Sequence, residues 1–356
     1  MRKKLNRIHL RSYFPFRELL LIFLVSRVVF YTFYAVLSSS VTKGSVSLCQ
    51  WDCNHYLSIT ANGYLLDQTQ DWGYFPLFPL LVNSFSKVGL DNNLLIGYFL
   101  NNLLLFASIL TLCKVFLTEK SLKERRLFYY LLSFSPATVY FSTFYTESLF
   151  LFLTSLVVWF LKHKHFQPFS LLMGLLLVTR GNGYFVVVSM FLSNFRMILR
   201  EFSWKFVSYT FIGLAPICMV LIYGELFLDE PYFLFKGSSI VTAIKNPNLE
   251  WVQSGITLNS LTNFVNLIVV VIAIVACVIF MREKMYFEFW LLLLTTIITS
   301  ITIFNFRYIL AIYPIYLLLA RIARLNRFLL SFCCLAYFLI FLILEYFWLL
   351  GMEFMV

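Results

Sequence analysis

Residues 51–79 read WDCNHYLSITANGYLLDQTQDWGYFPLFP, and the rest of the chain is organised around them. The stretch holds three carboxylates, Asp52, Asp67 and Asp71, together with His55 and seven aromatic rings. In the whole chain only 13% of the residues are charged and 61% are hydrophobic. Acidic side chains in so apolar a chain are costly and are usually functional, so we look for chemistry here first.

The composition is that of a polytopic membrane protein. Its mean hydropathy is +0.83, and 41 Phe and 21 Tyr give it more apolar surface than a soluble core of 356 residues can bury. The net charge of +11 would suggest nucleic acid as a partner of a soluble protein. Here Lys and Arg fall in short clusters between apolar runs, as membrane anchors do. We therefore expect an all-α membrane protein and no nucleic-acid partner.

Eleven apolar segments are predicted to cross the membrane, within a single membrane domain over residues 1–356. The first follows the basic start MRKKLNRIHLR without a small-residue cleavage site, which favours a retained helix over a cleaved signal. The fifth and sixth are short and are predicted to be half-helices that meet at the polar residues 180–183. The segments are 16–37, 92–117, 127–144, 147–161, 168–179, 183–196, 206–228, 261–280, 286–303, 307–320 and 328–350.

Positive charge is distributed unevenly across these segments. On one side lie 21 of the 28 Lys and Arg residues, including the N-terminal cluster, so that side is predicted to be cytoplasmic. The other side and the spans hold only Arg27, Lys43, Lys87, Arg180, Lys236, Lys245 and Arg307.

Two long loops, 38–91 and 229–260, are then extracytoplasmic, and the second is predicted to close over the first. Nucleotide donors are cytosolic, and the chain has no glycine-rich phosphate loop. A donor already carried across the membrane, such as a lipid-linked one, fits this location.

Residues 51–62 have helical apolar spacing, and Gly63 is expected to end the helix. On such an interfacial helix Asp52 and His55 are neighbours at i and i+3, which suits a general base or an anchor for a substrate hydroxyl. The alternative is an amphipathic helix in which Asp52 only caps or is solvated. Asp67 and Asp71 lie in a turn-rich stretch, where either is able to hold an acceptor sugar but is more simply explained as solvated.

Arg180 and Arg307 stand at the outer ends of predicted spans, where a guanidinium can hold a phosphate through two hydrogen bonds. The alternative for each is a structural ion pair with Glu147 or Glu225. Cys49 and Cys53 with His55 suggest a metal site only weakly, because no fourth ligand is evident. We predict no metal.

Several motifs resemble the PIG-V mannosyltransferases, a family of the GT-C class of polyprenyl-phosphate-sugar-dependent glycosyltransferases. The likeness is strongest at Trp51, Asp52, His55, Tyr56, Ile59, Gly63 and Tyr64, followed by YFPLFP at 74–79. Later matches are YTESLF at 145–150, Arg180, Gly181, Asn182 and Gly183 where the family usually has Arg-Ser-Asn-Gly, and Arg307, Tyr308 and Pro314. Gly181 and Cys53 depart from the usual residues, which leaves the acceptor open.

The resemblance implies a GT-C-like helical bundle that transfers mannose, with inversion, from a polyprenyl-phosphate donor to a glycan or glycolipid acceptor on the extracytoplasmic face. It assigns the base to Asp52. Substrate contacts are expected at His55, Asp71, Glu147, Arg180, Asn182 and Arg307, and the lipid-linked sugar is a substrate, with no separate cofactor.

The chain would be a bacterial relative of the transferase that adds the second mannose of GPI anchors, in a plasma membrane. The endoplasmic reticulum is the alternative location, which the absence of N-x-Ser/Thr sequons disfavours. A lipid or solute transporter and a noncatalytic subunit of a glycosyltransferase complex are the competing functions. A transporter usually shows inverted repeats, and we find none.

Overall fold

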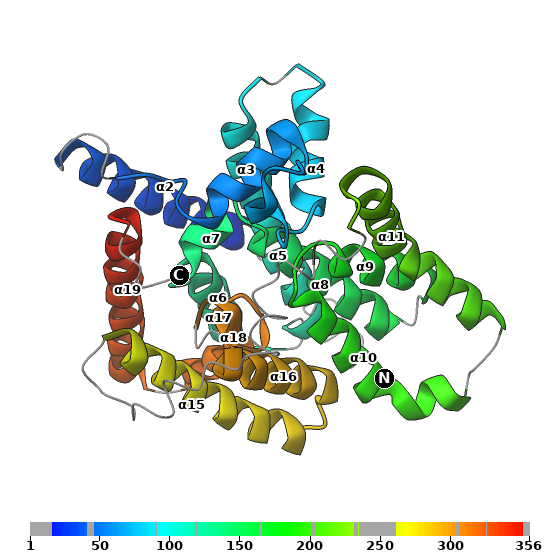
Figure 1. Ribbon diagram of the computed structural model, residues 1–356. Helices are drawn as coiled ribbons and strands as arrows, with labels where there is room; N and C mark the ends of the chain where they lie inside the picture. Colours follow the sequence, from blue (N-terminus) through cyan, green and yellow to red (C-terminus); the bar gives the residue numbers. More distant parts are fainter. Residues whose placement is uncertain are drawn as a thin grey trace.

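The computed structural model in Figure 1 describes residues 16–351 except 41–45, 90, 118–119, 164–165, 201–203, 231–233, 235–260, 303–305 and 325. Within these residues every element is a helix and none is a strand, which confirms the all-α prediction. The elements are α2 (Phe16–Ser40), α3 (Asp52–Asn62), η1 (Thr69–Asp71), α4 (Leu77–Ser86), α5 (Asn93–Phe116), α6 (Leu122–Ser133), α7 (Thr138–Ser142), α8 (Glu147–His163), α9 (Phe166–Leu177), α10 (Gly183–Arg200), α11 (Trp204–Leu228), α15 (Leu261–Arg282), α16 (Tyr286–Thr302), α17 (Phe306–Leu310), α18 (Pro314–Leu319), η2 (Ala320–Arg324) and α19 (Arg327–Leu349).

Four helices in the described part of the chain are long and apolar enough to cross a membrane. They are α2, α5, residues 211–228 of α11, and α19. Shorter apolar helices include α4 and parts of α10, α15 and α16. The helices begin and end close to most of the predicted segments, but the predicted number of about eleven spans stays a prediction.

The prediction of one continuous span over 127–144 is wrong. The chain leaves α6 after Ser133 and enters α7 at Thr138, because Pro136 has no backbone N–H and disfavours a helical conformation at the residue before it. The Ser135 hydroxyl accepts a hydrogen bond from the Ala137 N–H at 3.0 Å, which satisfies one of the freed backbone groups.

Two charged side chains from distant helices form hydrogen bonds with groups at this break. Arg27 of α2 donates to the Ser133 carbonyl oxygen and to the Ser142 hydroxyl. The Glu345 carboxylate of α19 accepts from the Val139 N–H at 3.1 Å. Backbone groups in a membrane protein must find partners inside the protein. The buried charges of Arg27 and Glu345 therefore have a structural role.

The predicted span 307–320 is also interrupted. Helix α17 ends at Leu310 and α18 begins at Pro314, which occupies a favoured first position of a helix. The Tyr316 hydroxyl donates to the Leu310 carbonyl oxygen at 2.7 Å and so satisfies the broken end. This interruption places Arg307 on a short segment of its own.

The opening stretch folds as predicted at its start. Residues 52–62 form α3, and Gly63 ends it at a φ of 72°, a conformation that glycine adopts at little cost. A second helix, α4, which sequence reasoning missed, follows Pro76 and packs against α3. In Figure 1 the pair lies at the top of the view, while α15 and α16 lie at the bottom. The predicted closing loop 229–260 lies almost entirely outside the described residues.

Helices α9 and α11 pack face to face through two glycines. A Cβ atom at Gly213 would lie 2.7 Å from the carbonyl oxygen of Ser170, and one at Gly174 would collide with the Gly213 backbone. Real Cβ atoms do not approach a backbone oxygen so closely. The crossing therefore depends on small residues, as close helix contacts in membranes usually do.

We expect Gly213→Val to destabilise the protein by about 1–3 kcal/mol, because the added methyl groups force α9 and α11 apart. Leu214→Val is the matched control, since Leu214 is 40% exposed on the same turn. Thermal unfolding in detergent measures both. Equal melting temperatures for the two variants would contradict this packing.

Candidate active site

Two basic and two acidic side chains meet where several helices begin. Asp52 is the first residue of α3, Glu147 is the first residue of α8, and Arg307 lies in α17. Arg307 Nη1 donates to Asp52 Oδ2 at 2.9 Å, and its Nε donates to Glu147 Oε1 at 2.7 Å. One guanidinium thus joins two carboxylates that are far apart in the sequence.

Arg180 completes the cluster from the turn between α9 and α10. Its Nη1 lies 3.0 Å from Glu147 Oε1, but it is not aligned for a hydrogen bond. Gly183 shapes this turn, because a Cβ there would collide with the Leu176 carbonyl oxygen. The predicted interruption between two helices at residues 180–183 is confirmed, since α9 ends at Leu177 and α10 begins at Gly183. That the two are half-helices within the membrane stays a prediction.

Aromatic rings surround both guanidinium groups. The Arg307 Cζ lies 4.1 Å from the ring centroid of Tyr140 and 4.9 Å from that of Tyr145. The Arg180 Cζ lies 5.3 Å from the ring centroid of Tyr308. These cation–π contacts stabilise the positive charges in a region with little water.

Burial differs sharply within the cluster. The side chain of Glu147 is fully buried, and those of Arg180 and Arg307 are each 7% exposed. The Asp52 side chain is 24% exposed. Of these four groups Asp52 is therefore the one that a substrate from outside reaches most easily, and Glu147 lies beneath the two arginines.

The sequence reasoning paired His55 with Asp52, and the structure corrects this. His55 Nδ1 lies 2.7 Å from Asp71 Oδ1, and the Ser58 hydroxyl donates to Asp71 Oδ2 at 2.7 Å. A carboxylate only accepts, so Nδ1 carries the proton and Nε2 is left as an acceptor in the neutral ring. Interpreting Asp71 as a solvated turn residue is wrong, because it is 1% exposed. Asp67 is exposed.

Tyr74 connects the two halves of the site. Its ring stacks on His55 with 4.5 Å between centroids, and its hydroxyl donates to Asp52 Oδ1 at 3.3 Å. Burial, and then the charge of Asp52, raise the pKa of Tyr74 well above its usual value. Tyr74 therefore stays neutral at physiological pH and acts as a donor to the carboxylate.

A disulfide between Cys49 and Cys53 brackets Asp52. The turn between them holds Trp51 at a φ of 43°, which is unusual for a residue other than glycine. Gln50 fastens this turn, because its carbonyl oxygen accepts from the Tyr145 hydroxyl at 2.7 Å and its side chain donates to the Leu349 carbonyl oxygen at 3.2 Å. The disulfide and the two hydrogen bonds of Gln50 therefore hold the start of α3, and with it Asp52, in place.

The same disulfide removes the weak metal interpretation, because disulfide sulfurs are not thiolate ligands. No group of three or more metal-ligating side chains occurs among the described residues.

Asn182 lies in the same turn as Arg180 and is 2% exposed. Its side-chain Nδ2 is buried and makes no hydrogen bond within the part of the chain that the structure describes. A buried amide donor without an acceptor costs free energy. Asn182 and Arg180 thus offer hydrogen-bond donors in one turn beside the cluster.

Comparison with known proteins identifies the family. Residues 23–268, more than half of the chain, match the family described as Mannosyltransferase (PIG-V). The chain belongs to the PIG-V mannosyltransferase family. The predicted resemblance is thereby confirmed. Each of Asp52, Glu147, Arg180 and Asn182 falls inside the matched range, whereas Arg307 lies beyond it.

A relative from Schizosaccharomyces pombe (strain 972 / ATCC 24843), GPI mannosyltransferase 2, is 28% identical over 147 residues. The alignment covers 39% of this chain and 30% of the relative, so the chain matches under a third of the relative's length. No solved structure shows a significant match.

For Arg180 and Arg307 the structure shows the alternative that the sequence offered, an ion pair with Glu147. Sequence reasoning missed the contact of Arg307 with Asp52 and the pairing of His55 with Asp71. Tyr74, Tyr140 and the disulfide were also missed as parts of the site. Two cysteines four residues apart, in a loop predicted to be extracytoplasmic, were an available signal for a disulfide. The spatial pairing of Arg307 with Asp52 had no local signal, because 255 residues separate them.

We expect Glu147→Gln to destabilise the protein by about 3–5 kcal/mol, because it leaves two buried guanidinium groups without their shared counter-ion. Asp52→Asn, at a more exposed position, should cost much less. Thermal unfolding in detergent compares the two. A Glu147→Gln protein as stable as Asp52→Asn would show that Glu147 does not hold the cluster together.

We expect reduction of the Cys49–Cys53 disulfide to loosen the start of α3 and so to lower the stability of the protein. Proteolysis without reductant, followed by mass spectrometry, should recover the linked peptide from membranes. Reductant should lower the melting temperature of the native protein but not that of a Cys49→Ser/Cys53→Ser variant. If reductant shifts both proteins equally, the disulfide does not fix this turn.

Proposed function

We propose that the protein is a membrane mannosyltransferase that uses a polyprenyl-phosphate-linked mannose and acts on the extracytoplasmic face. The observation that carries the proposal is the cluster of Asp52, Glu147, Arg180 and Arg307. It places one accessible carboxylate beside two guanidinium groups held by a buried carboxylate. The family and the relative's name supply the sugar.

In the proposed reaction the acceptor hydroxyl oxygen attacks the anomeric carbon of mannose, and the bond from that carbon to the phosphate oxygen breaks. Asp52 takes the hydroxyl proton, and the lipid phosphate leaves with the bonding electrons. A single displacement of this kind inverts the anomeric centre and forms no covalent enzyme intermediate. Arg307 holds Oδ2 of Asp52 at 2.9 Å, whereas Oδ1 accepts only a longer hydrogen bond of 3.3 Å from the neutral Tyr74 hydroxyl, so we assign the proton transfer to Oδ1.

The leaving phosphate needs positive charge and hydrogen-bond donors. Arg180 suits this task better than Arg307, because Arg307 is committed to both carboxylates whereas Arg180 Nη1 has no aligned acceptor. Asn182 Nδ2 adds a second donor from the same turn. We therefore assign the phosphate contact to Arg180 and Asn182, and a positioning role to Arg307 and Glu147.

His55 is proposed to hold the acceptor sugar. Asp71 and Ser58 fix its ring, and Tyr74 stacks beneath it. The side chain is 29% exposed, so its Nε2 is accessible to a sugar hydroxyl. Asp71, which is buried, then acts through His55 and does not touch the substrate.

Two observations support the extracytoplasmic face. Disulfides persist in oxidising compartments, and this one adjoins the site. Glu147, Arg180 and Arg307 lie at ends of predicted segments, and Asp52 lies in the predicted loop 38–91. The charge distribution assigns all four positions to the same side. A bacterial plasma membrane with an inward N-terminus remains our proposal for the location, and a glycan or glycolipid remains the proposed acceptor.

Asp52→Asn should lower mannosyl transfer by at least about 100-fold, because the acceptor hydroxyl loses its base. The assay uses membranes supplied with radiolabelled polyprenyl-phosphate mannose and follows label in glycolipid. Asp67→Asn is the matched control, since Asp67 is an exposed carboxylate in the same loop. Normal transfer by a folded Asp52→Asn protein would overturn the role of Asp52.

A further inference from the structure

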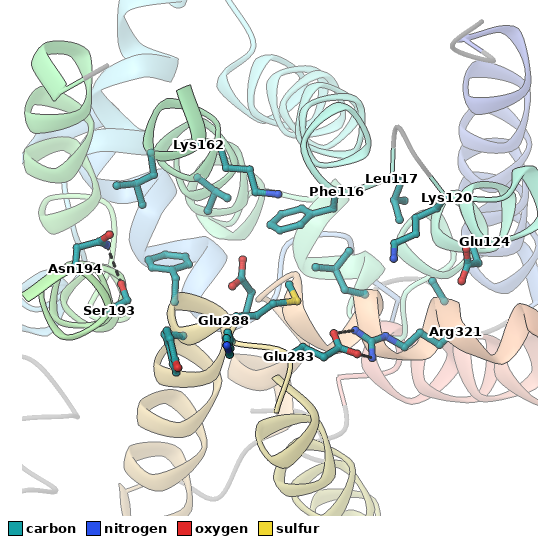
Figure 2. Close-up of a pocket in the computed structure, with 18 residues that line it drawn as sticks. Phe116, Leu117, Lys120, Glu124, Lys162, Ser193, Asn194, Glu283, Glu288 and Arg321 are labelled. Atoms are coloured by element: carbon teal, nitrogen blue, oxygen red, sulfur yellow. Dashed lines mark hydrogen bonds and ion pairs between the residues drawn. The ribbon is translucent and has the colours of Figure 1, made fainter. Parts of the chain in front are cut away.

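A cavity of about 520 Å³ lies among the ends of α5, α8, α16 and η2. Figure 2 shows Lys120, Lys162, Glu283, Glu288 and Arg321 around it. Helix α8 has 17 residues and is about 25 Å long at 1.5 Å per residue. It starts in the candidate active site with Glu147 and reaches the cavity with Lys162, so the two features lie at opposite ends of the same helix.

The helix ends that line the cavity are those that the charge distribution assigns to the cytoplasmic side. Its walls include apolar side chains, among them Phe116, Leu117 and Leu317. Its volume is within the range of small-molecule sites. A cavity with apolar walls and charged residues at a membrane surface is suited to a ligand that is itself half polar and half apolar.

The three acidic side chains that line the cavity each already have a hydrogen-bond partner. Glu283 holds Arg321 through two hydrogen bonds of 2.5 and 2.6 Å. Glu124 caps its own helix, where it accepts from the Ser121 N–H at 3.2 Å. Glu288 accepts from the Tyr313 hydroxyl at 2.9 Å and is 6% exposed.

The lysines lack such carboxylate partners within the described residues. Lys162 donates to the Val115 carbonyl oxygen at 3.0 Å, and its ammonium lies 4.0 Å from the ring centroid of Phe116. Lys120 and Lys284 line the same cavity, and neither forms an ion pair with a carboxylate in the described part of the chain. Glu288 attracts Lys162 electrostatically. The lining has four basic side chains and three acidic ones, so positive charge is in excess.

The backbone at Lys284 is a separate observation. This residue has a φ of 59°, in the left-handed region that glycine and asparagine favour. It stands in the tight turn that joins α15 to α16, where its N–H donates to the Met281 carbonyl oxygen at 3.2 Å. The next residue closes the end of α15, because the Met285 N–H donates to the Phe280 carbonyl oxygen at 2.9 Å. This turn brings Lys284 to the wall of the cavity.

We propose that this cavity binds the phosphate headgroup of an anionic glycerophospholipid from the cytoplasmic leaflet. Lys120, Lys162 and Lys284 hold the phosphate, and the upper part of an acyl chain lies along Phe116 and Leu117. Basic pockets between membrane helices on the cytoplasmic side recognise such headgroups. The lipid would join α5, α8 and the α15–α16 turn, and it is separate from the lipid-linked donor at the other end of α8.

Native mass spectrometry of the full chain, released from nanodiscs that mix phosphatidylglycerol and phosphatidylcholine, tests this proposal. We expect retained phosphatidylglycerol, and about a fivefold loss of retention for each of Lys162→Gln and Lys284→Gln. Lys87→Gln is the matched control, because Lys87 is an exposed lysine that follows α4 at the opposite end. Equal retention by all variants, or equal retention of phosphatidylcholine, would overturn the proposal.

A second measurement separates a lipid from a soluble phosphate and does not depend on the variants' own stability. Phosphatidylglycerol added to the delipidated native protein should raise its melting temperature, whereas glycerol 3-phosphate or inorganic phosphate at the same concentration should not. Equal stabilisation by the soluble phosphates would show that the cavity recognises a free anion, and the lipid assignment would be wrong. Neither result depends on mannosyl transfer.

Discussion

The Glu147 carboxylate, buried between Arg180 and Arg307, is the interaction on which the rest of the site depends. A buried carboxylate without a partner would be very costly, and so would either guanidinium. Together they let three segments converge: the start of α8, the turn before α10, and the short helix α17. Arg307 then extends the network to Asp52, where the cluster meets solvent.

The same logic applies within the bundle. The break between α6 and α7 exposes backbone groups that water would otherwise satisfy, and Arg27 and Glu345 supply the partners. Charged residues inside this chain are therefore not interchangeable. One set completes an interrupted helix, whereas the other is placed at helix starts around an accessible carboxylate. Counting charges does not separate these roles, but their partners do.

The sequence predicted a good part of this arrangement. Apolar periodicity and Gly63 predicted α3, and the motif at 180–183 predicted a turn between two helices, because such signals are local. The break at Pro136 and the pairing of His55 with Asp71 were missed. Asp71 looked like a turn residue by composition, and only the fold shows that it is buried. Contacts such as that of Arg307 with Asp52 depend on how distant helices pack, which no local pattern encodes.

Helix α8 separates two charged regions of the molecule by about 25 Å: the cluster of acidic and basic side chains beside the disulfide, and the lysine-rich cavity. We propose that the cluster holds the donor phosphate. An electron cryomicroscopy map with a non-transferable polyprenyl-phosphate mannose analogue tests this most directly. The phosphate is predicted to lie on Arg180 and Asn182, with the sugar between it and Asp52. Phosphate density away from this cluster, with Asp52 facing no sugar, would contradict the account.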